Sequence, residues 1–275
     1  MIAGQAERIV QLKNFREEES KYDSCPVITF TSGKGGTGKT FTAINTAFLL
    51  SERKKVLLID FNLNFSSLGT MLNLIPQSTI PDFLNSRVFF EDIIFHFTDN
   101  LHLIMGDDGN INNNGGKEDE ILSFLQKLGD SRGSYDYILI DCPPGVPAEV
   151  LTAIKFADIN IVVANTDPTS VMDAYAITKI STVNNLSGLN CVLFNKCIDE
   201  NDAVTASENL QKAVNHFLGI EIIHLGYIPF EKDIMSSFQN QKIYLKEYPG
   251  TTTAKQFSVL LNRLEKNRQM ANNHH

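Results

Sequence analysis

Seven short apolar runs recur along the chain and alternate with stretches that have helical periodicity. Each run is apolar almost throughout, as strands buried on both faces of a parallel sheet are. This alternation predicts one doubly wound α/β domain, with a mainly parallel sheet of about seven or eight strands flanked by helices. The predicted strands cover residues 27–31, 56–60, 101–105, 137–141, 159–164, 191–194 and 224–228, and the predicted helices cover residues 39–52, 118–130, 147–156, 171–185, 203–218 and 252–268.

The two ends of the chain differ from this pattern. Residues 1–15 place apolar side chains at helical spacing, and residues 16–24 are polar and typical of a linker. We therefore expect an N-terminal amphipathic arm with a linker over residues 1–24, a single domain over residues 25–269 and a disordered tail over residues 270–275. The apolar stripe of the arm consists of Ile2, Ala6, Ile9 and Val10.

Composition narrows the classes of function. The hydrophobic fraction of 43% is that of a globular chain, and the net charge of −8 gives no general attraction to nucleic acid. No apolar run approaches the ~18 residues of a membrane span. The four cysteines lack the CxxC spacing of a metal site, so the chain is expected in a reducing cytoplasm. These are Cys25, Cys142, Cys191 and Cys197.

A glycine-rich loop joins the first predicted strand to the first predicted helix. Its sequence, SGKGGTGKT, matches the phosphate-loop pattern G-x-x-x-x-G-K-[ST] at Gly33, Gly38, Lys39 and Thr40. Glycines let backbone N–H groups approach phosphate oxygens, and the helix N-terminus favours negative charge. Lys39 is expected to reach the β- and γ-phosphates, and Thr40 to bind Mg²⁺. The alternative interpretation is a glycine-rich turn with a surface lysine.

Two predicted strands end in aspartate. VLLID ends at Asp60 and YILID ends at Asp141. Ligands of open α/β sheets lie at the carboxyl ends of the strands, so both carboxylates are expected to meet the same nucleotide. The predicted metal ligands are therefore Thr40, Asp60 and Asp141. Alternatively, each aspartate caps the helix that follows it.

The string KGGTGKT resembles the variant Walker A motif of the MinD/ParA family of P-loop ATPases, over roughly residues 26–265. The resemblance implies ATP and Mg²⁺ as cofactors and a homodimer formed on ATP binding, in which Lys34 reaches the partner's phosphates. It also implies that DCPPG, which contains Asp141, is the Walker B segment. The expected phosphate-binding residues are Gly33, Lys34, Gly35, Gly36, Thr37, Gly38, Lys39, Thr40 and Phe41.

Two positions depart from the family pattern. The family's second acidic motif is hhhhDxD. Asp60 matches its first aspartate, but Asn62 stands at the position of the second. In relatives this second aspartate positions the attacking water, whereas an amide is no base. The expected catalytic residues are Lys34, Lys39, Asp60 and Asn62, with slow hydrolysis. The second departure is Phe41, where relatives have a small or polar residue; its backbone N–H is still expected to serve phosphate.

The resemblance extends to the base of the nucleotide. Asn195, in CVLFNKC, matches the family's adenine-contacting asparagine, and GYIPFEKDI places Pro229 and Glu231 in the family's G-x-I-P-[YF]-[DE] segment. Without the resemblance these are ordinary loop residues. No NKxD motif for guanine is present, which favours ATP.

Two segments indicate a branch of the family. Residues 165–179 are similar to a segment of MinD and of its flagellar relatives FlhG/FleN, with Asp167 in place of glutamate. Residues 4–10 resemble the flagellar group's DQAxxLR arm, which stimulates the GTPase FlhF. The resemblance implies control of flagellar number or placement, with an FlhF-like GTPase or basal-body proteins as partners. Peripheral attachment at the inner membrane or the cell pole is a further expectation.

The C-terminal segment argues against two other partners. The stripe of Phe257, Leu260, Leu261 and Leu264 is expected to pack on the sheet, and the polar tail after it does not suit membrane insertion. Basic residues occur near the end but lack interleaved aromatics, so DNA is not an expected partner. They are Lys255, Arg263, Lys266 and Arg268.

Two hypotheses for the function follow. One is an enzyme, an ATP-driven dimerisation switch that hydrolyses ATP slowly. The other is an ATP-loaded scaffold with little or no turnover, arrested by Asn62. Two related classes fit less well, since iron–sulfur carriers need a cysteine pair and tyrosine autokinases carry a C-terminal tyrosine cluster, whereas the last tyrosine here is Tyr248.

Overall fold

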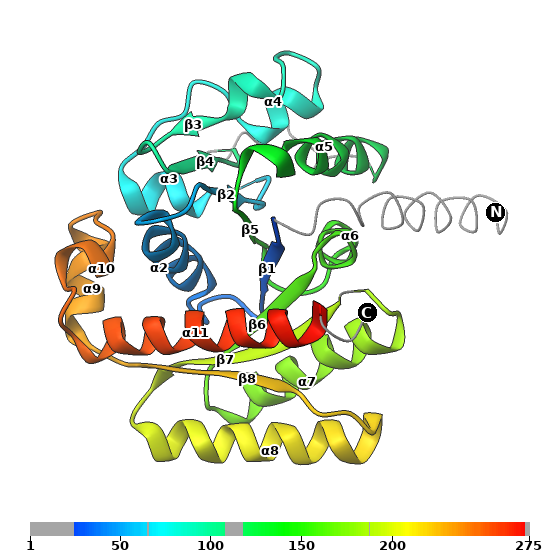
Figure 1. Cartoon of the computed structure of the whole chain (residues 1–275), viewed down its shortest axis with the longest axis vertical. Helices are drawn as coiled ribbons and strands as arrows, with labels where there is room; N and C mark the ends of the chain where they lie inside the picture. Colours follow the sequence, from blue (N-terminus) through cyan, green and yellow to red (C-terminus); the bar gives the residue numbers. More distant parts are fainter. Residues whose placement is uncertain (1–24, 65, 108–117, 187, 273–275) are drawn as a thin grey trace, which may run out of the picture.

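A computed structural model describes residues 25–64, 66–107, 118–186 and 188–272. Within these ranges, eight strands form one sheet in the order β3-β4-β2-β5-β1-β6-β7-β8, and only the β3–β4 pair is antiparallel (Figure 1). The strands are β1 (Val27–Thr31), β2 (Val56–Asp60), β3 (Phe95–His96), β4 (Leu101–Ile104), β5 (Tyr137–Asp141), β6 (Ile159–Ala164), β7 (Leu189–Cys197) and β8 (Ile223–Pro229).

The strand prediction is confirmed for all seven predicted runs. The additional strand is β3, whose two residues pair with β4 at the sheet edge and are too short to give a period. Strand β7 extends beyond the predicted residues 191–194 at both ends, into the polar residues Asn190 and Asn195. A search for hydrophobic runs underestimates the length of a strand whose terminal residues are polar.

Helices cover both faces of this sheet. Side chains of α2, α3, α9, α10 and α11 join one hydrophobic cluster, whereas α4 to α8 pack on the opposite face. The α-helices are α2 (Lys39–Ser51), α3 (Ser67–Leu72), α4 (Ile80–Leu84), α5 (Glu118–Asp130), α6 (Ala148–Phe156), α7 (Pro168–Val183), α8 (Glu200–Leu218), α9 (Lys232–Gln239), α10 (Tyr244–Glu247) and α11 (Thr252–Asn272), with 3₁₀ turns η2 (Glu91–Ile93) and η3 (Ser131–Ser134). Figure 1 shows α4 near the β3–β4 end of the sheet and α8 near the β8 end.

The central strands are buried on both faces. In β2, Val56 and Leu58 face the α2–α11 side, whereas Leu57 and Ile59 face α5 and α6. All four are fully buried. This two-sided burial explains the continuous apolar runs in the sequence and fixes the carboxyl ends of β1, β2 and β5 side by side.

Two helices begin three residues before their predicted starts. Asp167 caps α7 by accepting from Ser170 N at 3.0 Å, and Asp199 caps α8 by accepting from Asp202 N at 2.8 Å. Aspartate at the N-cap satisfies N–H groups that the first turn leaves without partners. The predicted starts at residues 171 and 203 followed the apolar period and missed these caps.

The predicted arm over residues 1–24 and the last three residues of the predicted tail lie outside the described residues. Helix α11 continues to Asn272, past the predicted end at residue 268. The expectation for its apolar stripe is confirmed, because Phe257, Leu260 and Leu264 are buried in the cluster that contains β8. No helix in the described part of the chain is long and apolar enough to cross a membrane.

Candidate nucleotide-binding site

The glycine-rich loop leaves β1 and leads directly into α2. Gly36 and Gly38 have φ values of 78° and 90°, a conformation that L side chains rarely adopt. Gly38 is also the N-cap residue of α2, and no side chain of the described residues caps this helix. The first N–H groups of α2 are therefore available to an anion, as in phosphate-binding loops.

The loop after β7 supports the glycine-rich loop from the side. Asn195 Nδ2 donates to Thr37 O at 2.8 Å, and Lys196 Nζ donates to Gly36 O at 2.7 Å. A Cβ on Gly38 would lie 2.0 Å from Asn195 Nδ2, so only glycine fits there. The other end of the Asn195 amide accepts from Lys196 N at 2.9 Å. Since both ends of this amide are occupied, its predicted contact with adenine stays a prediction.

Lys39, Thr40 and Asp141 lie together at the start of α2. Thr40 Oγ1 donates to Asp141 Oδ2 at 2.5 Å and lies 3.1 Å from Ser67 Oγ. Asp141 Oδ1 is buried and has no hydrogen-bond partner among the described residues. Burial and the neighbouring Asp60 charge raise the pKa of Asp141 to about 7, although Lys39 and the Thr40 hydrogen bond act in the opposite direction. A cation beside Oδ1 would favour the ionised form.

The second aspartate, Asp60, is directly paired with Asp141 in the β2–β5 register. Its Oδ2 accepts hydrogen bonds from Ser66 Oγ at 2.9 Å, Ser67 N at 2.7 Å and Leu68 N at 3.0 Å. Its Oδ1 accepts from the Asn62 backbone N–H at 3.1 Å. Asp60 thus ties the first turn of α3 to the end of β2, which is the helix-capping alternative raised for this residue.

Full burial raises the pKa of Asp60 above its usual value, although its hydrogen bonds act in the opposite direction. Two adjacent carboxylates cannot both ionise cheaply in a dry site. The hydrogen bonds of Asp60 favour its charged form, whereas burial opposes the ionisation of both carboxylates. The predicted catalytic and metal roles of Asp60 and Asn62 stay predictions.

Lys34 contacts the N-terminus of α7 within its own chain. Its Nζ donates to Asp167 Oδ1 at 3.0 Å, to Asp167 Oδ2 at 3.3 Å and to Thr169 Oγ1 at 2.8 Å. The hydrogen bonds from Thr169 and Lys34 lower the pKa of Asp167 to about 2. We call this contact of Lys34 with Asp167 and Thr169 the lysine latch.

The unusual Phe41 is a core residue. Its ring is 4% exposed and lies 5.6 Å from Phe238, 5.7 Å from Tyr244 and 5.9 Å from Phe257, measured between ring centroids. These partners belong to α9, α10 and α11. The ring therefore anchors the first turn of α2 to the C-terminal helices. The predicted contact of the Phe41 backbone N–H with phosphate stays a prediction.

Pro229 and Glu231 follow β8 and differ in their surroundings. Pro229 is half-buried at the end of the strand. Glu231 accepts from Tyr244 Oη through one oxygen and from Thr253 N at 3.2 Å through the other. Glu231 therefore holds α10 and the start of α11. The predicted nucleotide contacts of both residues stay predictions.

The site offers the groups that a magnesium nucleotide requires. Mg²⁺ is usually bound through one or two carboxylates together with phosphate and water oxygens. Asp141, with its unpartnered Oδ1, and the Thr40 and Ser67 hydroxyls supply oxygens at the mouth of the glycine-rich loop. Among the described residues no group of three or more His, Cys, Asp or Glu side chains could hold a metal alone. The arrangement fits a metal that arrives with phosphate.

Three residues of this site were missed by the sequence reasoning. Lys196 was considered only as part of a missing guanine motif, although it follows Asn195 and has a φ of 57°. Ser67 follows the second acidic motif and matches no position of it. Thr169 lies in a segment that was considered a sign of kinship.

Comparison with known proteins gives the family. A family model described as "ParA: NUBPL iron-transfer P-loop NTPase" matches residues 25–265. The antiactivator FleN of Pseudomonas aeruginosa is 23% identical over 240 residues, which cover 87% of this chain and 86% of FleN. The flagellum site-determining protein YlxH of Helicobacter pylori is 27% identical over 260 residues, which cover 90% of this chain and 85% of YlxH.

Solved structures agree on the fold. The septum site-determining protein MinD of Pyrococcus horikoshii, solved as a complex with Mg-ADP, superposes with a TM-score of 0.75 at 23% sequence identity. The match covers 90% of this chain and 98% of that one. At this identity the likeness shows a common fold, including the order of strands and helices around the glycine-rich loop.

Proposed function

Since the chain belongs to the ParA/MinD family of P-loop NTPases, we propose that it is a slowly hydrolysing ATP-dependent dimerisation switch that regulates flagellar number or placement. The observation that carries the proposal is the lysine latch. Lys34 is held 3.0 Å from Asp167 in the single chain, at the mouth of a loop built for phosphate. From this position the Lys34 ammonium group can exchange Asp167 for a phosphate that a second copy presents.

In the proposed ATP complex, the N–H groups of the glycine-rich loop and Lys39 bind the phosphates. Thr40 and Asp141 hold Mg²⁺, which supplies charge neutralisation to the phosphate oxygens. Asp141 would then be ionised, although its burial favours the protonated form. The hydroxyls of Thr40 and Ser67, which lie beside Asp141, would be further oxygen donors to this metal.

The proposed dimer forms when Lys34 leaves Asp167 and reaches the partner's phosphates. A second cation at the transferring group stabilises charge that develops in phosphoryl transfer. In the monomer Lys34 is paired with Asp167. The dimer therefore forms only if the phosphates of the partner's ATP bind Lys34 more strongly than Asp167 does. The switch thus has two states with different contacts for the same ammonium group.

Slow hydrolysis follows from the second acidic motif. Both oxygens of Asp60 accept hydrogen bonds from the segment 62–68, so this carboxylate is committed to α3. Asn62 carries no charge and cannot accept a proton from water. The chain therefore orients the attacking water without a strong base. The alternative is a scaffold that holds ATP and does not turn it over.

A single-turnover assay tests these two functions. The protein is loaded with labelled ATP and Mg²⁺, and ADP formation and dimer content are followed together. We expect ADP to form slowly and the dimer to decay with it. Asn62→Asp should raise turnover by about tenfold or more, equivalent to ~1.4 kcal/mol. Asn64→Asp, an exposed neighbour, is the matched control and should leave turnover unchanged.

Two results would redirect the proposal. Intact ATP in a dimer that persists for hours would support the scaffold. A protein that retains no nucleotide would refute both functions, and would mean that Phe41 and Asn62 mark a degenerate site. If Asn62→Asp changes nothing, Asn62 does not limit hydrolysis.

The flagellar role is supported by the similarity to YlxH, which is named as a flagellum site-determining protein, and to the antiactivator FleN. An FlhF-like GTPase or basal-body proteins are the proposed partners, in the cytoplasm with peripheral attachment at the inner membrane or the cell pole. Deleting the gene in its host and counting flagella per cell tests this role. A wild-type number and position of flagella would refute it.

The name of the matching family model suggests a second candidate, iron transfer. The cysteines of this chain argue against iron transfer. All four are buried and unpaired, and burial raises the pKa of each thiol well above its usual value. A thiol must ionise to bind iron. Failure of the reduced protein to bind Fe²⁺ under anaerobic conditions would exclude this function.

A further inference from the structure

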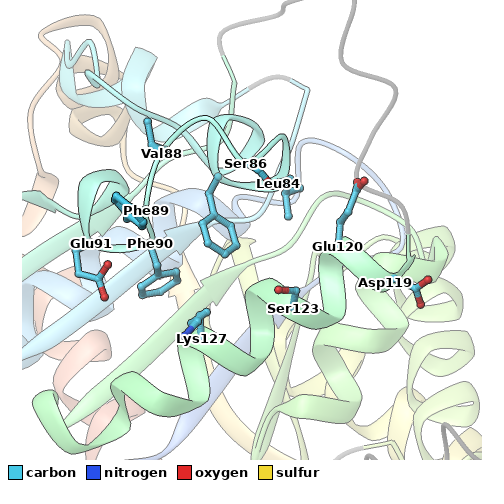
Figure 2. Close-up of a pocket in the computed structure, with 11 residues that line it drawn as sticks. Leu84, Ser86, Val88, Phe89, Phe90, Glu91, Asp119, Glu120, Ser123 and Lys127 are labelled. Carbon is cyan, nitrogen blue, oxygen red and sulfur yellow. The ribbon is translucent and has the colours of Figure 1, made fainter.

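A groove of about 550 Å³ lies between α5 and the segment that joins α4 to η2, away from the glycine-rich loop (Figure 2). One wall is a face of α5 with Glu120, Ser123 and Lys127 at helical spacing. The other wall is the segment around Val88 and Phe89. Neither the proposed nucleotide contacts nor the proposed dimer uses this groove.

The base of the groove is rigid and aromatic. Phe90 and Phe83 pack edge to face at 5.7 Å, and both contact Phe124, which is fully buried, at 5.9 and 6.1 Å. Phe89 stands above them with 78% of its surface exposed. Its backbone N–H donates to Asp92 Oδ2 at 2.9 Å, so the turn that presents this ring is fixed. A fixed, exposed aromatic ring over an apolar base is typical of a binding surface.

The rim of the groove is acidic. Glu91, Asp119 and Glu120 line it with a single base, Lys127. Such a surface suits a segment that combines a narrow apolar stripe with basic flanks. The first sixteen residues of the chain have this composition. Their stripe is Ile2, Ala6, Ile9 and Val10, and they carry the basic residues Arg8, Lys13 and Arg16 against one acid, Glu7.

This segment joins the described chain on the face of the sheet that carries the groove. Cys25, the first described residue, is buried in the cluster that contains Phe90 and Phe124. Arg132, in the turn after α5, is close enough to influence the Cys25 thiol. The eight residues 17–24 can span up to about 26–29 Å when extended. The linker therefore lets the apolar stripe reach a groove that begins one α5 length or less away.

We propose that residues 1–16 dock in this groove of their own chain, with the apolar stripe on Phe89 and Phe90 and the basic flanks on the acidic rim. The inference does not depend on the proposed ATP switch. While the arm is docked, its apolar stripe is covered. A partner that recognises this stripe must first displace the arm from the groove. The effective concentration of a segment tethered by a short linker is in the millimolar range, so modest contacts suffice.

Cysteine cross-linking of the full chain tests the proposal. Ala6→Cys with Ser123→Cys should give a cross-linked monomer with a short bis-maleimide. The native cysteines are buried and do not compete. Ala6→Cys with Glu208→Cys, on α8 at the far edge of the sheet, is the control and should not cross-link. Phe89→Asp should lower the yield of the first pair by about fivefold or more, as loss of about 1 kcal/mol predicts.

Matched variants separate docking from misfolding. Phe217, on α8, is 68% exposed and comparable to Phe89, and Phe217→Asp should leave the yield unchanged. Ile9→Asp should act like Phe89→Asp. A yield no higher than that of the Glu208→Cys control would overturn the proposal, as would insensitivity to Phe89→Asp. Cross-links between a chain with the position 6 substitution and a chain with the position 123 substitution would also overturn it, since the occupant would then be a second copy.

Discussion

Replacing Asp167 with asparagine should tighten the ATP-bound dimer. The change removes the negative charge that holds Lys34 in the monomer. Asparagine is as good an N-cap as aspartate, so in Asp167→Asn the amide oxygen still accepts from Ser170 N and α7 keeps its start. The perturbation is thus confined to the ion pair of the lysine latch.

The magnitude follows from exposure. The side chains of Lys34 and Asp167 are 38% and 43% exposed, so the pair has the modest strength of a surface ion pair, about 0.2–1 kcal/mol. A dimer opens two latches, one in each protomer. Removing the charge should therefore favour the dimer by about 0.4–2 kcal/mol, which lowers its dissociation constant about twofold to thirtyfold.

Sedimentation in the presence of Mg²⁺ and a non-hydrolysable ATP analogue measures this constant without interference from turnover. Glu247→Gln is the matched control, because Glu247 pairs with Lys242 at 3.1 Å at similar exposure and lies on α10. It should leave the dissociation constant unchanged. A constant that is unchanged or raised in Asp167→Asn would refute the view that the latch opposes dimerisation.

Three further predictions concern single side chains. The pKa of Asp141 is about 7 in the folded chain, against 3.8 normally. Without Mg²⁺ the free energy of unfolding should therefore fall as the pH rises from about 4 to 7, by up to about 1.4 kcal/mol per pH unit. Asp141→Asn should abolish this fall in denaturation titrations. Phe41→Ala should cost about 3–5 kcal/mol in urea unfolding, and exposed Ile75→Ala under 0.5 kcal/mol. Gly38→Ala should weaken ATP-analogue binding at least about tenfold in calorimetry, whereas Gly133→Ala, in η3 with open space around its Cβ, should not. Equal effects within either pair would contradict the assigned contacts.

The fold was largely predictable because its signal is spread over many residues. A strand buried on both faces, such as β2, is apolar at nearly every position, so one misleading residue does not hide it from a pattern search. The glycine-rich loop was predictable for a related reason. Its glycines are required by backbone conformation, as the φ of 90° at Gly38 shows, so the motif is local in sequence.

Short elements and their exact contacts were not predictable, since their stability comes from partners elsewhere in the chain. Helix α3 has six residues and is held by the carboxylate of Asp60 rather than by an apolar period. Helix α10 has four residues and depends on Tyr244, which is buried beside Phe41. Neither helix is long enough to produce a periodic pattern of its own.

The two aspartates show where residue-type reasoning ends. Both Asp60 and Asp141 end a central strand, and the sequence predicts both as metal ligands. The chain after each strand makes the difference. After Asp60 it turns back at once, and three N–H groups and a hydroxyl from residues 62–68 surround the carboxylate. After Asp141 it passes through two prolines, which have no N–H to donate, and Oδ1 stays without a partner. A buried carboxylate oxygen that its own loop cannot satisfy requires an external cation or a proton, so the loop sequence after the strand, more than the aspartate itself, indicates which of the two carboxylates is suited to hold the metal.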